Sequence, residues 1–137
     1  MNTDKNLELS LVLFRLATVA FLLVWVFQKL LVPAGAQGVF KTFYFSELPV
    51  VLISAFGVAQ LLIVLAFGLG FLRFWSYGAV IIMHAVSTLS TIPRLMDPFT
   101  KPNALFWAAV PVLAGLVGLF LMRDRDRLFS IDARRGR

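Results

Sequence analysis

The sequence predicts an all-α integral membrane protein, an antiparallel four-helix bundle whose N- and C-termini both lie in the cytoplasm. Of its 137 residues 60% are hydrophobic and 15% are charged, whereas soluble domains are about 45–50% apolar and about 25% charged. The apolar residues form long runs, and each run is long enough to cross a bilayer once or twice. Because four spans use most of this length, we expect a single domain over residues 1–137.

The first predicted span runs from Leu9 to Val32 and contains only a few polar residues. At about 1.5 Å per residue, a helix of this length crosses a hydrocarbon core of about 30 Å. The apolar run is also longer than the core of about 7–15 residues in a secretory signal peptide. We therefore expect this segment to be retained as a membrane helix.

The second and third spans lie within one apolar stretch from Leu48 to Ile92, which is about twice the length of a single crossing. The chain must therefore turn back once inside the stretch. The two glycines that precede Arg73 disfavour a continuous helix and mark the turn. The prediction is an antiparallel helical hairpin of Leu48–Leu69 and Leu72–Ile92.

The segment from Pro93 to Pro102 separates this hairpin from the fourth span. It holds three prolines and is expected to form an external loop rather than a helix. Asn103 is expected to cap the fourth span, Ala104–Met122. Pro111 is expected to introduce a kink that neighbouring helices can absorb.

The distribution of basic residues predicts the orientation. With both ends inside, nine lysines and arginines are cytoplasmic and four are external, which agrees with the positive-inside rule for a multi-pass protein of the cytoplasmic (inner) membrane. The tail, residues 123–137, has six arginines and three aspartates, and a basic segment directly after a span favours anionic lipid over nucleic acid. The residues expected at the lipid head groups or as topology signals are Arg15, Arg73, Arg123, Arg125 and Arg127.

Polar residues recur at steps of three and four along the first three predicted spans, so each of these helices carries a polar stripe. Most of them fall in the outer half of the bilayer, which predicts a small polar pocket open to the outer face. A purely structural role, hydrogen bonding to a neighbouring helix, stays open for the hydroxyl and amide side chains. Lys29 and Glu47 lie near the same outer interface and can either pair or each reach water separately. The predicted ligand-binding residues are Gln28, Lys29, Glu47, Gln60, His84, Ser87 and Thr88.

His84 is the single histidine of the chain. A buried imidazole can hydrogen-bond a quinone carbonyl or relay a proton, and a bridge between two helices is an equally open interpretation. The chain has no cysteine, which removes thiolate nucleophiles, thiolate metal sites and disulfides. Phosphate-loop, zinc-protease and nucleophile-elbow motifs are also missing from the sequence. We predict no catalytic residue, no metal site and no stand-alone enzyme.

Four short features occur in a recognisable order. Arg15-Leu16 opens the first span, Gln28-Lys29-Leu30 closes it, the glycine-rich turn precedes Arg73, and the third span contains Met83-His84-Ala85. Between about residues 13 and 122 the chain therefore resembles the DoxX-like family of small four-helix membrane proteins, which includes DoxD-type and MauE-type subunits. Gln60 stands where many members of that family have a glutamate.

The resemblance implies a compact bundle that serves as an accessory subunit of a membrane redox system, in some members near the quinone pool. Quinone is the cofactor that it implies, and the expected partners are the lipid bilayer and another membrane or redox protein, or a second copy of the chain. The alternative is a non-enzymatic assembly, maturation or scaffold subunit that binds another membrane protein. The ligand-binding residues above are the candidate site under the first of these hypotheses.

Overall fold

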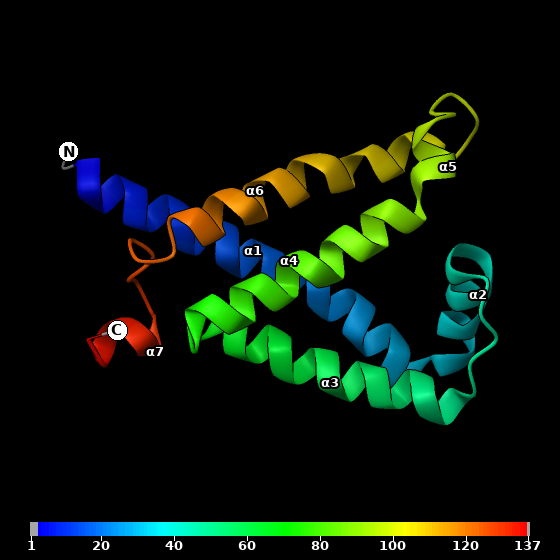
Figure 1. Ribbon diagram of the computed structural model, residues 1–137, viewed down its shortest axis with the longest axis horizontal. Coiled ribbons are helices and arrows are strands. Elements are labelled where there is room, and N and C mark those ends of the chain that lie inside the picture. The colour runs from blue at the N-terminus through cyan, green and yellow to red at the C-terminus, as the bar shows by residue number, and fades with distance from the viewer. Residues whose placement is uncertain (1–2, 137) are drawn as a thin grey trace.

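The computed structural model describes residues 3–136, and every regular element in that range is helical (Figure 1). The predicted all-α class is therefore confirmed. Four of the elements are long helices, three are single helical turns or short helices, and one is a 3₁₀ helix. In chain order they are α1 (Thr3–Leu31), α2 (Pro33–Tyr44), α3 (Val50–Gly68), α4 (Arg73–Ser90), α5 (Ile92–Leu95), η1 (Asn103–Ala108), α6 (Ala109–Leu121) and α7 (Ile131–Arg134).

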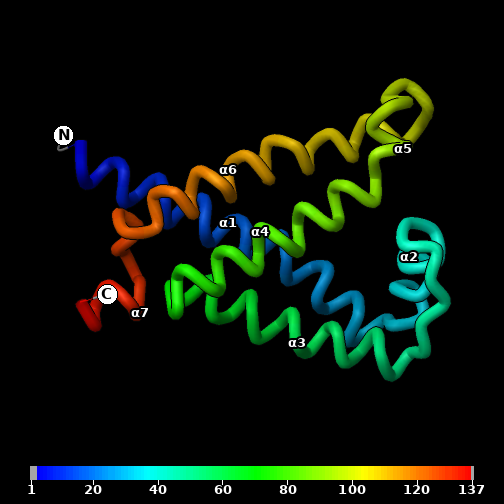
Figure 2. The backbone as a smooth tube through the Cα atoms, viewed as in Figure 1, coloured from blue at the N-terminus to red at the C-terminus, as the bar shows by residue number. Residues whose placement is uncertain are grey.

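The long helices pack as neighbours, α1 against α3, α3 against α4 and α4 against α6. Figure 2 shows that both chain termini and the turn between α3 and α4 lie at one end of the molecule. The helices α2 and α5 lie at the other end. The core that joins the long helices consists of Leu11, Leu22, Val26, Val64, Phe67, Tyr77, Val80, Leu116 and Leu119.

Three helices within residues 3–136 are long and apolar enough to cross a membrane: α1, α3, and the continuous segment of η1 and α6. Their outer faces carry large exposed apolar side chains such as Val24, Leu62 and Leu105. Such faces favour lipid over water, so the chain is a membrane protein. The helix α4 has 18 residues but is less apolar, because it contains Arg73, His84 and several hydroxyl side chains.

The hairpin turn lies where the glycines predicted it. The helix α3 ends at Gly68 and α4 begins at Arg73. Between them Gly70 has a φ of +57° and Leu72 has a φ of +49°. Glycine adopts this left-handed conformation at little cost, and these two residues, one on each side of Phe71, reverse the direction of the chain.

Several predicted boundaries differ from the structure. The first helix begins at Thr3 rather than Leu9, since its polar first turns continue the helix beyond the apolar run. The expected outer loop after it contains α2, which starts at Pro33. Proline is favoured in the first turn of a helix, where its missing N–H is not needed.

The segment around the second predicted loop also contains helical turns. Pro93 lies in the first turn of α5, so it starts a new helical turn where a loop was expected. Asn103 does not cap the fourth helix, because Pro102 occupies the cap position of η1. The Asn103 side chain instead donates from Nδ2 to the carbonyl of Asp97 at 2.8 Å. The last long helix therefore begins as a 3₁₀ segment held to the preceding loop.

Candidate functional site

The most strongly connected polar group lies at the end of the molecule that carries the termini. Arg15 on α1 has a relative exposure of 0%. Its Nη1 donates to the Tyr77 hydroxyl at 3.0 Å and to Oδ2 of Asp126 at 2.9 Å. The Tyr77 hydroxyl in turn donates to the same Asp126 oxygen at 2.8 Å. We call these three residues the Arg15 cluster; it ties α1, α4 and the C-terminal tail together.

Burial decides the electrostatics of the Arg15 cluster. Arg15 and Asp126 form an ion pair in which both side chains are fully buried. Burial raises the pKa of the Asp126 carboxyl, while the hydrogen bond from Tyr77 and the positive charge of Arg15 act to lower that pKa. Arg15 also donates from Nη2 to the carbonyl of Leu128 at 2.5 Å. A buried guanidinium is tolerated only when such partners replace water.

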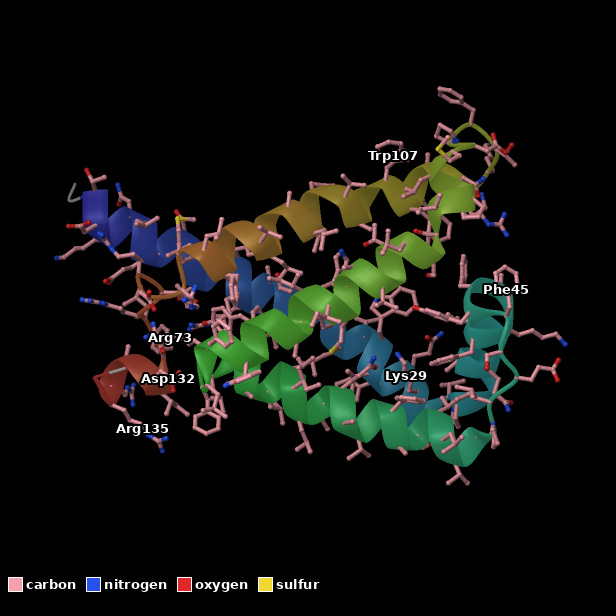
Figure 3. All side chains as sticks on the ribbon, viewed as in Figure 1. Lys29, Phe45, Arg73, Trp107, Asp132 and Arg135 are labelled. Atoms are coloured by element: carbon pink, nitrogen blue, oxygen red, sulfur yellow. The ribbon has the colours of Figure 1, made fainter. Side chains whose placement is uncertain are left out.

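A second pair of charged residues lies beside the Arg15 cluster. The Asp132 carboxylate accepts hydrogen bonds from the backbone N–H groups of Leu72 and Arg73, at 3.1 and 2.8 Å. It therefore supplies a cap and a negative charge at the N-terminus of α4, where the helix dipole favours one. The Arg73 guanidinium donates to the carbonyl of Arg123 at 2.6 Å and to that of Asp126 at 3.2 Å. Figure 3 shows Arg73 and Asp132 at this end, where Asp132 belongs to α7 (Ile131–Arg134).

The tail is also joined to the turn between α3 and α4 through its backbone. Ile131 donates to the carbonyl of Leu69 at 2.9 Å, and Asp132 donates to that of Gly70 at 3.1 Å. The Ser130 hydroxyl donates to the same Gly70 carbonyl at 3.1 Å. A Cβ atom on Gly70 would lie 2.9 Å from the Cα of Ser130. The turn and the tail are thus fitted to each other so closely that a side chain at Gly70 has no room.

This arrangement corrects the expectation that Arg15 and Arg73 reach the lipid head groups, because both are buried within the protein. The other predicted arginines, which lie in the tail, also have partners in the protein. Arg123 lies over the rings of Phe74 and Phe120, Arg125 pairs with Asp4, and Arg127 donates to the carbonyl of Asp124. The tail is folded against the bundle and does not lie apart from it as a solvated basic segment.

The sequence did contain a signal for this cluster. An arginine deep in an apolar helix needs a partner that offsets its desolvation, and the four predicted spans contain no aspartate or glutamate. The acids on the same predicted side of the membrane are Asp4 and Glu8 before the first span and the three aspartates of the tail. The sequence interpretation treated the tail only as a net positive charge, and so missed Asp126 and Asp132.

The predicted pocket residues lie apart from the Arg15 cluster, and their hydrogen bonds do not join them in one site. His84 is 3.0 Å from the carbonyl of Ala109 through Nε2, which connects α4 to α6. Thr88 donates to the carbonyl of His84 on its own helix. Lys29 donates to the carbonyl of Trp25, also on its own helix, and Figure 3 shows its position on α1. Of the others, Ser87 is exposed, and the half-buried residues are Gln28 and Gln60.

Of the two alternatives for Lys29 and Glu47, the pairing between them is absent from the described residues. Glu47 forms its ion pair with Lys41, at 2.6 Å, and both side chains are largely exposed. The physical reason is α2, which was not predicted. It brings Lys41 close to the segment that follows the helix, whereas Lys29 remains on the last turn of α1. Glu47 and Lys41 line a small open cavity of about 260 Å³.

A larger open cavity, of about 310 Å³, lies at the same end of the molecule as α2 and α5. Its walls come from the end of α2, from the junction of α4 and α5, and from the loop that leads to η1. Within residues 3–136 no group of three histidine, aspartate or glutamate side chains is placed to hold a metal ion. The residues that carry the chemistry of the cavity are Thr42, Phe43, Ser90, Arg94, Asp97 and Asn103.

Comparisons of this chain with protein-family models, with curated proteins and with solved structures give no match. The DoxX-like resemblance therefore remains a hypothesis that rests on the residues quoted for it.

Proposed function

We propose that this protein is a non-enzymatic accessory subunit of the cytoplasmic membrane, a four-span bundle with both termini inside that binds another membrane protein. One observation carries the proposal: His84, the strongest candidate for ligand chemistry, is engaged in holding α4 to α6. The remaining polar candidates bond mainly to their own helices or face outward. The outer surface of the long helices, in contrast, is rich in exposed apolar side chains.

The fourth crossing in this proposal is α4. A helix of 18 residues is about 27 Å long, close to the hydrocarbon thickness of about 30 Å. It packs between α3 and α6, which are long and apolar enough to span. Packing between two spanning helices offsets the lower hydropathy of α4, because its polar face is turned into the bundle. Its buried polar residues are Arg73, Ser76, Tyr77, His84 and Thr88.

The topology is tested by labelling single cysteines in this cysteine-free chain. Thr100 and Arg134 are exposed. Thr100 follows α5 and Arg134 belongs to α7, and these two helices lie at opposite ends of the molecule (Figure 1). Thr100→Cys is expected to react with an impermeant maleimide in intact cells, and Arg134→Cys only after permeabilisation. Labelling of both residues from the same side would mean that the segment of η1 and α6 between them does not cross the membrane, and would contradict the proposed topology.

Partner binding is tested with a photo-reactive amino acid at Leu62 or Ile82, which are 64% and 66% exposed on α3 and α4. The matched control is Phe129, which is 70% exposed but lies in the tail. The proposal expects a discrete protein adduct from at least one of the two membrane positions after irradiation of intact cells. Adducts with lipid alone from both positions would contradict it.

A second candidate is a subunit that contacts the quinone pool, as the resemblance implies. One feature of His84 favours it. The Ala109 carbonyl can only accept, so Nε2 is the donor in this contact, and Nδ1 of a neutral imidazole is then an acceptor. Within the described residues no hydrogen bond reaches Nδ1. The ring is thus suited to accept from the hydroxyl of a quinol, and mass spectrometry of lipids that co-purify in mild detergent tests this candidate.

A further inference from the structure

The cavity of about 310 Å³ brings together two opposite charges that do not neutralise each other. Arg94 and Asp97 both line it and both are exposed. Among residues 3–136 the ion pairs do not include one between these two side chains. A ligand that enters the cavity therefore meets a guanidinium and a carboxylate three residues apart. Such a pair is suited to a zwitterion rather than to a simple anion or cation.

The third polar residue of the cavity is Asn103, which is only 2% exposed. Its Nδ2 donates to the carbonyl of Asp97 at 2.8 Å. Its Oδ1 has no hydrogen-bond partner within the described part of the chain. Buried acceptors without a partner are uncommon in proteins and call for an explanation. An N–H or O–H donor on a bound ligand would provide the missing hydrogen bond.

The surroundings of the cavity indicate that it faces the membrane interface. Phe45, Met96 and Phe99 are 90%, 80% and 96% exposed, and they lie on the segments that form its walls. Large exposed apolar side chains that lie close together mark a surface that contacts a membrane or a partner. Figure 3 shows Phe45 at the end of the molecule away from the termini, beyond the long helices. The molecules most abundant at this position are phospholipid head groups.

We propose that this cavity binds a phospholipid head group that combines a phosphate with a primary ammonium, as in phosphatidylethanolamine. Arg94 pairs with the phosphate, since a guanidinium matches the geometry of phosphate oxygens. The ammonium donates one N–H to Asp97 and another to the Oδ1 of Asn103. The ring of Phe43 forms the apolar wall, and the volume lies at the small end of the range for ligand pockets.

The proposal makes a sharp distinction between two common lipids. Phosphatidylcholine has the same phosphate and a similar volume, but its quaternary ammonium carries no N–H. It therefore leaves the Asn103 acceptor unpaired, and a site built to hydrogen-bond a donor discriminates strongly against an analogue that lacks one. Phosphatidylglycerol also presents its phosphate to Arg94, but its neutral glycerol lacks the positive charge that pairs with Asp97.

The test is native mass spectrometry of the full-length protein in detergent, titrated separately with phosphatidylethanolamine, phosphatidylcholine and phosphatidylglycerol. We expect the dissociation constant of the ethanolamine lipid to be lower than that of the choline lipid by a factor of at least about ten. Arg94→Gln and Asp97→Asn are each expected to remove this preference. Both side chains are exposed, so the variants keep the fold. Lys101→Gln is the matched control, because Lys101 is an exposed cation of the same loop that does not line the cavity.

Soluble glycerophosphoethanolamine distinguishes the two sources of this chemistry. If glycerophosphoethanolamine displaces phosphatidylethanolamine at an equal concentration, the site is assigned to a free zwitterion. If displacement needs a far higher concentration, the site is assigned to the lipid. Both results support a site for a phosphate and an ammonium. Equal affinity for the ethanolamine and choline lipids, tighter binding of phosphatidylglycerol, or no effect of Arg94→Gln and Asp97→Asn would each overturn the proposal.

Discussion

The two ends of this bundle use the same kind of interaction in opposite environments. At the end with the termini, Arg15 and Asp126 form an ion pair at 2.9 Å in which neither side chain is exposed. At the other end, Lys41 and Glu47 form an ion pair at 2.6 Å with exposures of 70% and 76%. The shorter distance belongs to the weaker interaction, because water screens an exposed pair and a buried pair has no substitute for its partner.

The comparison extends beyond these two pairs. Around Arg15 the tail, the turn between α3 and α4, and two helices are joined by hydrogen bonds between buried groups. Around Lys41 the structure has open cavities and exposed polar residues. One end is covered by the protein's own tail, and the other end has open cavities lined by polar and charged side chains. We therefore expect substitutions to affect stability mainly at the closed end.

The largest effect is expected for Arg15→Leu. The change leaves Asp126 buried without its cation, and removal of one partner of a buried ion pair typically costs about 3–5 kcal/mol. The free energy of unfolding is measured in detergent by chemical denaturation. The control is Arg125→Leu, which breaks the exposed pair with Asp4 and is expected to have a much smaller effect.

The double variant Arg15→Leu, Asp126→Leu sharpens this test. Because the second substitution removes the unpaired carboxylate, the double variant is expected to be more stable than Arg15→Leu alone. If the two losses simply add, Arg15 and Asp126 stabilise the protein independently, and the ion pair is not what closes this end.

The sequence predicted the helical class, the hairpin turn and the apolar helices because these depend on local composition and on run length. It did not predict α2, since the run from Pro33 to Tyr44 is too short and too mixed to stand out as a helix. It missed the Arg15 cluster because that cluster joins residues 111 positions apart. The hydropathy of the first span places Arg15 within the membrane. The position of the folded tail is needed to show that Asp126 is its partner.

A smaller but clear effect is expected for Gly70→Ala. The residue has a positive φ, and a methyl group there would also meet the backbone of Ser130. A non-glycine residue held in this conformation costs of order 1–3 kcal/mol. The matched control is Gly118→Ala in α6, where an added Cβ meets no atom within 4 Å. Equal melting temperatures for these two variants would show that the turn and the tail are not fitted as described.

His84→Ala tests the contact of α4 with α6, which lies along the bundle and away from both ends. If His84 only bridges α4 and α6, its loss is expected to cost about 0.6 kcal/mol, the average for hydrogen bonds inside membrane proteins. Quinone content after purification is measured on the same samples. A small loss of stability with unchanged ligand content supports the structural role. Loss of bound quinone without a change in stability would favour the redox interpretation, in which Nδ1 contacts the ligand.

The smallest effect is expected for Lys41→Gln at the open end. The pair with Glu47 lies in water, so its attraction is screened and its formation restricts two flexible side chains. Exposed pairs of this kind contribute about 0–1 kcal/mol, and the high exposure on both sides places this one in the lower half of that range. Raising the ionic strength is also expected to leave the melting temperature of the unmodified protein nearly unchanged. At 1 M salt the Debye length is about 3 Å, so exposed pairs are screened, but they contribute little stability. The buried pair at Arg15 is shielded from ions and keeps its contribution. A loss of stability from Lys41→Gln as large as that from Gly70→Ala, or a steep fall in melting temperature with salt, would mean that exposed charges hold the open end. The contrast between the two ends would then be wrong, since both would depend on ion pairs for their stability.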